Sequence, residues 1–240
     1  MSPLGLVGAA GIGIANQERN ASSTSVRRPS LAGPVLTCYS GYVLNVGVLQ
    51  VQHPDGQVFA FEPGSLALAF VITGAPTEPP WFETLEDPSD LGRWARDVLN
   101  APSMAASPAD LAAAKSLRSA IFRATDAVID GRRPANVDRR LLNDAARLPP
   151  MTPRLTRDST SGWASPVTAR ALLSAIARDA IELVGGPKAA RLKRCEGVNC
   201  AIPFVDTSRP GTRRWCSMER CGNRAKARTH YRQHRKELSS

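Results

Sequence analysis

The stretch "CSMERCGNR", residues 216–224, constrains how the C-terminal part of this chain folds, because it holds two cysteines with four residues between them. The stretch "CEGVNC", residues 195–200, has the same spacing, and a short loop joins the two pairs. Two close cysteine pairs of this kind are typical of a structural zinc site, since each pair can wrap around one side of the ion. The pattern therefore predicts one structural Zn²⁺ per chain, bound by Cys195, Cys200, Cys216 and Cys221.

Other interpretations of these cysteines fit less well. Two disulfides would need an oxidising compartment, which nothing in the sequence indicates. A redox pair usually has two residues between its cysteines, and a catalytic zinc keeps one coordination position open. The fifth cysteine, Cys38, is interpreted as a small buried apolar residue. His230 and His234 could bind metal at i and i+4, but they are better explained as part of a basic helix face.

The segment that carries the four cysteines is poor in large apolar side chains. They are Ile202, Phe204, Val205, Trp215 and Met218. So few apolar side chains cannot offset the backbone entropy that is lost when about 45 residues fold. A metal bound by four thiolates supplies on the order of 10–16 kcal/mol of apparent binding energy. We therefore predict a metal-dependent finger, with a hairpin of "AIPFV" (201–205) and "RRWC" (213–216) before a helix.

Positive charge is concentrated in the same segment. Residues 188–240 contain 14 Lys+Arg and 4 Asp+Glu, which accounts for the whole formal net charge of +10 in the 240-residue chain. Residues 1–187 are neutral overall, with 17 residues of each sign. This asymmetry is typical of a polyanion-binding module attached to a neutral domain, although a solvated basic tail would give the same count.

The sequence "GNRAKARTHYRQHRKEL" (222–238) has no proline and predicts a basic helix. At about 100° per residue, Arg224, Arg228, Tyr231 and Arg235 would share one narrow face. A solvated cationic face is the alternative, but arginine predominates there over lysine. The planar guanidinium group of arginine suits contacts with phosphate and guanine. The candidate nucleic-acid contacts are Arg213, Arg214, Arg224, Lys226, Arg228, Tyr231 and Arg235.

The N-terminal part is expected to be mainly helical, with minor β structure. Residues 87–99, 107–131, 134–148 and 165–186 have apolar residues at helical spacing, and Ser89 and Ser107 are candidate N-caps. Hairpins are predicted at 42–61 and 151–164, whereas 63–75 fits a short apolar helix or a buried strand equally well. The predicted fold class is thus α+β, mostly α, with a leader of weak structure over 1–55, a helical domain over 56–187 and the finger over 188–240.

At this point the sequence resembles a known family. Residues 191–235 resemble the CGNR zinc finger and carry its signature, namely Asp206, Ser208, Arg213, Arg214, Trp215, the four cysteines, Gly222, Asn223, Arg224 and Lys226. The upstream part, from "FEPGSLALAFVITG" to "GGPKAARL", resembles the ABATE domain. Ala69 and Ile72 stand where that family usually has Asp and Asn, so a role of those polar groups is not expected here. The resemblance implies zinc bound by the cysteines and DNA bound by the finger.

These observations together predict a non-enzymatic, cytoplasmic regulator of transcription in bacteria. Its helical domain would sense an effector, whose identity the sequence does not give, or mediate association such as a homodimer. No catalytic constellation is recognisable, His53 lies in a predicted turn, and no apolar run is long enough to span a membrane. Two alternatives stay open: an RNA-binding or ribosome-associated protein, and an enzyme in the helical domain that the finger targets.

Overall fold

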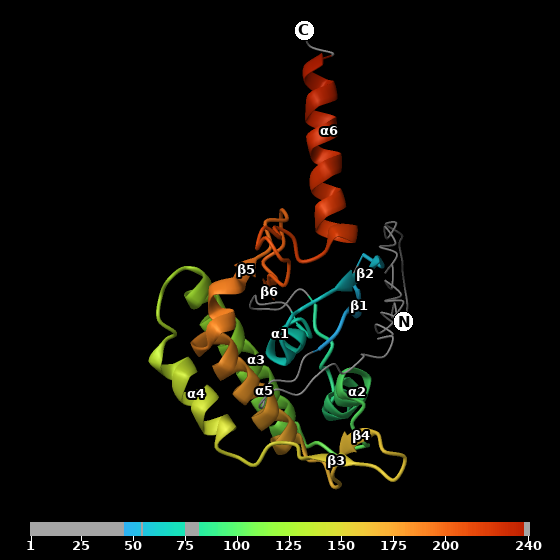
Figure 1. Cartoon of the computed structure of the whole chain (residues 1–240), viewed down its shortest axis with the longest axis vertical. Coiled ribbons are helices and arrows are strands. Elements are labelled where there is room, and N and C mark those ends of the chain that lie inside the picture. Colours follow the sequence, from blue (N-terminus) through green and yellow to red (C-terminus); the bar gives the residue numbers. More distant parts are fainter. Residues whose placement is uncertain (1–45, 54, 75–81, 238–240) are drawn as a thin grey trace, which may run out of the picture.

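Three helices form a bundle in the N-terminal part of this computed structural model, which describes residues 46–53, 55–74 and 82–237 (Figure 1). They are α3 (Pro108–Ile129), α4 (Asn136–Ala146) and α5 (Ala169–Gly185), and they pack against one another. Their facing side chains are aliphatic and fully buried, as at Ile121 and Leu172. The three predicted helices are confirmed, and the fold class is α+β, mostly α.

None of the helices described is long and apolar enough to cross a membrane. Cys38 and residues 42–45 of the predicted first hairpin lie outside the described residues.

The helices begin at side chains that satisfy their first backbone N–H groups. Ser107 caps α3 as predicted, because its hydroxyl accepts from the N–H of Asp110. The N-cap of helix α2 (Pro88–Leu99) lies two residues before the predicted cap at Ser89. This N-cap is Asp87, because the buried Asp90 carboxylate accepts from the N–H of Asp87 and fixes the first turn.

Residues 63–75, for which the sequence left helix and strand open, contain a short helix, α1 (Leu66–Val71). All its side chains are buried, including Ala69. The buried carboxylate of Asp179 in α5 accepts a 2.8 Å hydrogen bond from the N–H of Ala67 and so holds the start of this helix. Burial raises the pKa of Asp179 to about 6, although the hydrogen bond from Ala67 opposes the shift.

Three two-stranded antiparallel hairpins complete the described chain. They are β1 (Leu49–Gln52) with β2 (Val58–Phe61), β3 (Pro153–Leu155) with β4 (Ser161–Trp163), and β5 (Leu192–Arg194) with β6 (Pro203–Val205). Strand β1 of the first hairpin lies within residues 1–55, where a weakly structured leader was expected. Leu49 in β1 is buried, so part of that segment belongs to the packed fold.

The strand pairing of the finger differs from the prediction. Residues 201–205 do contain a strand, β6, but its partner is β5, before the first cysteine, and residues 213–216 form no strand. The reason lies in side-chain contacts within the folded loop. The N–H of Arg213 donates to the carboxylate of Asp206, and the carbonyl of Arg213 accepts from the Lys193 ammonium. The N–H and carbonyl groups of Arg213 are therefore bonded to side chains and are not available for pairing with another strand. The predicted order, a hairpin followed by a helix, is confirmed.

The last helix, α6 (Asn223–Glu237), projects away from the remainder of the molecule (Figure 1). A single π-helical turn, Met218–Gly222, leads into it directly from the metal-binding cysteines. The side chains described along α6 are exposed or half-buried, so the helix has no apolar face packed on the body. A helix that is polar all round gains little from packing and is stabilised mainly where it is attached or where it meets a partner.

Candidate metal centre and basic helix

The four predicted metal ligands meet in space. The sulfur atoms of Cys195, Cys200, Cys216 and Cys221 all lie within 4.8 Å of one another, and they are the cluster of possible metal ligands found among the described residues. Cys216 Sγ is 3.7 Å from both Cys200 Sγ and Cys221 Sγ. Zinc–sulfur bonds of about 2.3 Å in a tetrahedron place sulfur atoms about 3.8 Å apart, whereas a disulfide needs about 2.05 Å. The arrangement therefore fits one tetrahedral Zn²⁺ with a closed shell.

Backbone geometry around the cysteines also suits thiolates. The N–H groups of Gly197 and Cys216 point at Cys195 Sγ, at 3.4 and 3.3 Å. These two N–H groups can stabilise the negative charge of a thiolate at Cys195. A Cβ atom at Gly197 would lie 2.9 Å from Cys221 Sγ, so the chain can pass this close to the sulfur cluster only as glycine.

Asp206 organises the loop between the two cysteine pairs. Its carboxylate is buried and accepts from the Lys193 ammonium at 2.7 Å, from the N–H of Arg213 at 2.9 Å and from the N–H of Ser208 at 3.0 Å. Although burial opposes it, these donors hold the pKa of Asp206 well below its usual range, so the group stays ionised. A charged, fully hydrogen-bonded carboxylate thus holds together a loop that has few apolar side chains.

Arg213 and Arg214 are adjacent in sequence but have different surroundings. The Arg213 guanidinium lies 4.4 Å from the centre of the Phe204 ring and donates to the carbonyls of Trp215 and Cys216. Its donors therefore hold the finger together, and this placement does not favour a nucleic-acid contact. Arg214 is on the surface, where it pairs with Glu196 at 2.6 Å and lies 5.0 Å from the Trp215 ring.

The remaining candidate contacts lie on α6. Arg224, Lys226, Tyr231 and Arg235 are exposed, and Arg228 is half-buried. Arg224 and Arg228 are in the first two turns and face the first hairpin, whereas Tyr231 and Arg235 are farther along the projecting part. The predicted basic face therefore begins next to the body, at Arg224 and Arg228, and continues into the projecting part of the helix, at Tyr231 and Arg235.

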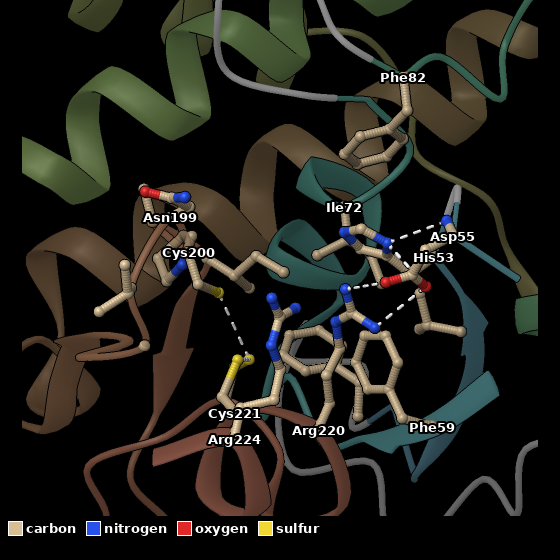
Figure 2. A pocket seen from close by; sticks show the side chains of 18 of the residues that line it. His53, Asp55, Phe59, Ile72, Phe82, Asn199, Cys200, Arg220, Cys221 and Arg224 are labelled. Carbon is tan, nitrogen blue, oxygen red and sulfur yellow. Dashed lines mark hydrogen bonds and ion pairs between the residues drawn. The ribbon is translucent and has the colours of Figure 1, made fainter. Parts of the chain in front are cut away.

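The finger is joined to the N-terminal part by contacts that the sequence did not reveal. The buried Arg220 guanidinium donates to both carboxylate oxygens of Asp55, at 2.8 and 3.2 Å, and to the Gln57 side chain at 2.6 Å (Figure 2). The Arg220 guanidinium holds the pKa of Asp55 well below its usual range. Glu219, the preceding residue, accepts from the N–H of Ala60 at 2.8 Å.

A second junction lies at the other side of the finger. Arg194 in β5 pairs with Asp126 of α3 at 2.5 Å, and the N–H of Val205 donates to the carbonyl of Pro63 at 3.1 Å. Phe59 and Phe61 of β2 pack into one apolar cluster with three of the cysteines and Phe204. No sequence signal marks these contacts, because Arg220 and Arg194 look like further members of the basic segment. The finger and the hairpin consequently share a core.

A closed four-cysteine metal centre, a short hairpin and a basic helix define a zinc-finger protein. Residues 191–234 match the family profile of the CGNR zinc finger, and residues 64–187 match that of ABATE, described as "Putative stress-induced transcription regulator". The chain belongs to the ABATE family and carries a C-terminal CGNR zinc finger. Comparison with curated proteins found no similar chain.

Proposed function

We propose that this protein acts by binding DNA as a transcription regulator, with α6 as the element that docks on the duplex. The observation that carries the proposal is the surface of α6, a helix that projects from the body. Its four arginines and Lys226 are exposed or half-buried, and Arg224, Lys226 and Arg228 have no acidic partner among the described residues. An α-helix fits the major groove, and guanidinium groups suit phosphates and guanine edges.

The metal centre would fix the direction of this helix. Cys221 is the last ligand, and α6 begins two residues later. A zinc ion there makes the first turn of the helix part of a rigid unit, and Arg220 ties that unit to the first hairpin. Four thiolates leave no coordination position for a substrate, so the metal would serve structure and not catalysis. We propose accordingly that the chain is a binding protein and not an enzyme.

Fluorescence anisotropy with a labelled duplex, after selection of bound sequences from a random duplex pool, tests the proposal. A double variant, Tyr231→Ala with Arg235→Ala, should weaken binding by about tenfold or more while zinc content stays at one per chain. If about six phosphates are contacted, the slope of log affinity against log salt should be roughly −5. The control is Arg139→Gln, which removes one exposed charge from α4 as Arg235→Ala removes one from α6. Equal losses in the two variants would contradict a docking role for α6.

RNA binding is the alternative that the same charge supports. Competition between the selected duplex and a structured RNA of equal length separates the two, since displacement by the RNA at equal or lower concentration would overturn the assignment to DNA. One short helix reads few bases, so we further propose that two copies of the chain combine on one site. Sedimentation of the protein with and without the selected duplex measures that association.

A further inference from the structure

A cavity of about 730 Å³ lies between the first hairpin, the end of α1 and the finger (Figure 2). Cys200, Cys216 and Cys221 are part of its wall, so one end of this volume belongs to the metal centre. Its volume is within the range of small-molecule sites. Most of its wall is apolar and comes from both parts of the chain. Its apolar side chains include Phe59, Phe61, Ile72, Phe82 and Phe122 from the N-terminal part and Val198 and Ile202 from the finger. A cavity lined this way gains free energy when it exchanges water for hydrocarbon or an aromatic ring.

Three arginines stand in the polar part of the wall. Arg220 is neutralised there by Asp55, so this pair adds no net charge. Arg224 and Arg228 also line the cavity, and neither has an acidic partner among the described residues. Burial first, and then Arg220 and Arg224, lower the pKa of the nearby His53, although Asp55 opposes the shift. Cys200, Cys216 and Cys221 line the same cavity, and a Zn²⁺ ion held by four thiolates carries about two net negative charges, so the wall as a whole is close to neutral. An anion is favoured only next to the Arg224 and Arg228 guanidinium groups.

We propose that this cavity is the binding site of a small apolar carboxylic acid. Its carboxylate would bind Arg224 and Arg228, and its hydrocarbon or aromatic part would lie against Phe59, Ile72 and Phe82. A guanidinium group binds a carboxylate through two parallel hydrogen bonds, and two such groups in a partly dry site bind it more strongly than in water. A nucleotide or sugar phosphate is a poorer fit, because most of the wall offers no donors for its many polar groups.

The site would couple the two parts of the molecule. Its walls belong to the hairpin, α1 and the finger together, so a ligand binds tightly only when these elements keep their present arrangement. The same two arginines begin the basic face of α6. A bound carboxylate would hold them toward the body and reduce the charge available to a duplex. This coupling rests on the proposed DNA binding, whereas the binding site itself does not, and the effect is reciprocal between the two ligands.

Calorimetric titration of the zinc-loaded full chain tests the site. The probes are 2-naphthoate and decanoate, and each is compared with its uncharged amide. We expect one carboxylate per chain, bound about tenfold or more tightly than its amide. The double variant Arg224→Gln with Arg228→Gln should remove this preference, and Ile72→Trp, which fills the cavity, should weaken both forms. Arg139→Gln with Arg140→Gln on α4 is the control with the same charge change and should bind as the parent does.

Failure of the proposed binding site can be distinguished from failure of the proposed function. If neither carboxylate binds, or if each binds no better than its amide, the site is overturned whatever the protein does with DNA. If the preference survives in the Arg224 and Arg228 double variant, the assigned anion position is wrong. In a second measurement, a saturating carboxylate should weaken duplex binding by about fivefold or more in the parent. Carboxylate binding without any duplex binding would reject the DNA proposal and leave the site intact.

Discussion

In the helical body, the side chains that meet between α3 and α5 are almost all aliphatic, whereas in the finger charged side chains hold backbone groups around four sulfur atoms. The body is stabilised by many small apolar contributions, each proportional to the area that it buries. The finger depends on a few strong and directional interactions, with one metal ion at their centre.

The comparison teaches that the two regions should fail differently. Removing one apolar side chain from the body leaves its other contacts, so stability falls by a limited amount. Removing one ligand from the finger removes the ion and leaves Phe204 almost alone as a large, fully buried side chain of that segment. Because Phe59 and Phe61 of the first hairpin pack on the finger, its loss would also expose part of the N-terminal structure. Four predictions test this contrast.

The largest effect is expected from Cys216→Ser. Loss of one thiolate should reduce zinc from about one ion per chain to almost none, because the ion supplies on the order of 10–16 kcal/mol to this segment. Metal analysis measures the ion, and hydrogen exchange should show the finger unprotected and α3 to α5 still protected. Cys38→Ser is the matched control and should retain its zinc. Normal zinc content in Cys216→Ser would contradict the four-cysteine site.

Truncation in the body should give the opposite pattern. Ile121 is fully buried in α3, so Ile121→Ala should lower the free energy of unfolding by about 2–5 kcal/mol. Zinc content should stay at about one per chain, because Ile121 and the cysteines belong to different apolar clusters. Val137→Ala, at an exposed position of α4, should change stability by less than about 0.5 kcal/mol. Loss of zinc in Ile121→Ala would mean that the two regions do not fail separately.

The sequence allowed the helices and the metal ligands to be predicted for the same reason: both depend on spacing along the chain. The cap at Ser107 and the interval between the cysteines are local patterns. The partner of β6 could not be predicted, because Arg213 and Lys193 decide it through contacts with Asp206 that only the folded loop creates. The junction through Arg220 was missed because a buried arginine and an exposed one are identical in sequence.

The next effect concerns pH in the body. Burial raises the pKa of Asp179 to about 6 from an ordinary value of 3.8, so between these values the folded chain binds the proton that the unfolded chain releases. The contribution of this group to stability is therefore greatest below about pH 4. It declines by about 3 kcal/mol as pH rises from about 4 to above 6. Asp179→Asn keeps an acceptor for the N–H of Ala67 and cannot ionise. Its stability relative to the parent should rise over this pH range, as denaturant unfolding at pH 4 and pH 7 would measure. A constant difference would contradict the raised pKa.

The smallest effect is expected from Gly197→Ala, which tests how closely the finger depends on its geometry. The added Cβ would lie 2.9 Å from Cys221 Sγ and 3.2 Å from the Cβ atoms of Cys200 and Cys221, so the chain or a ligand has to shift by a few tenths of an ångström. Metal affinity should fall by about tenfold, which corresponds to about 1.4 kcal/mol, as competition with a chromophoric chelator would show. Gly185→Ala, at the end of α5, is the matched control, since a Cβ there meets nothing within 4 Å. A finger held mainly by apolar packing would repack around one methyl group at little cost. One held by four sulfur atoms around an ion has fixed distances and loses affinity instead. Equal zinc affinity in the two variants would therefore count against the contrast between the regions as well as against the position of Gly197.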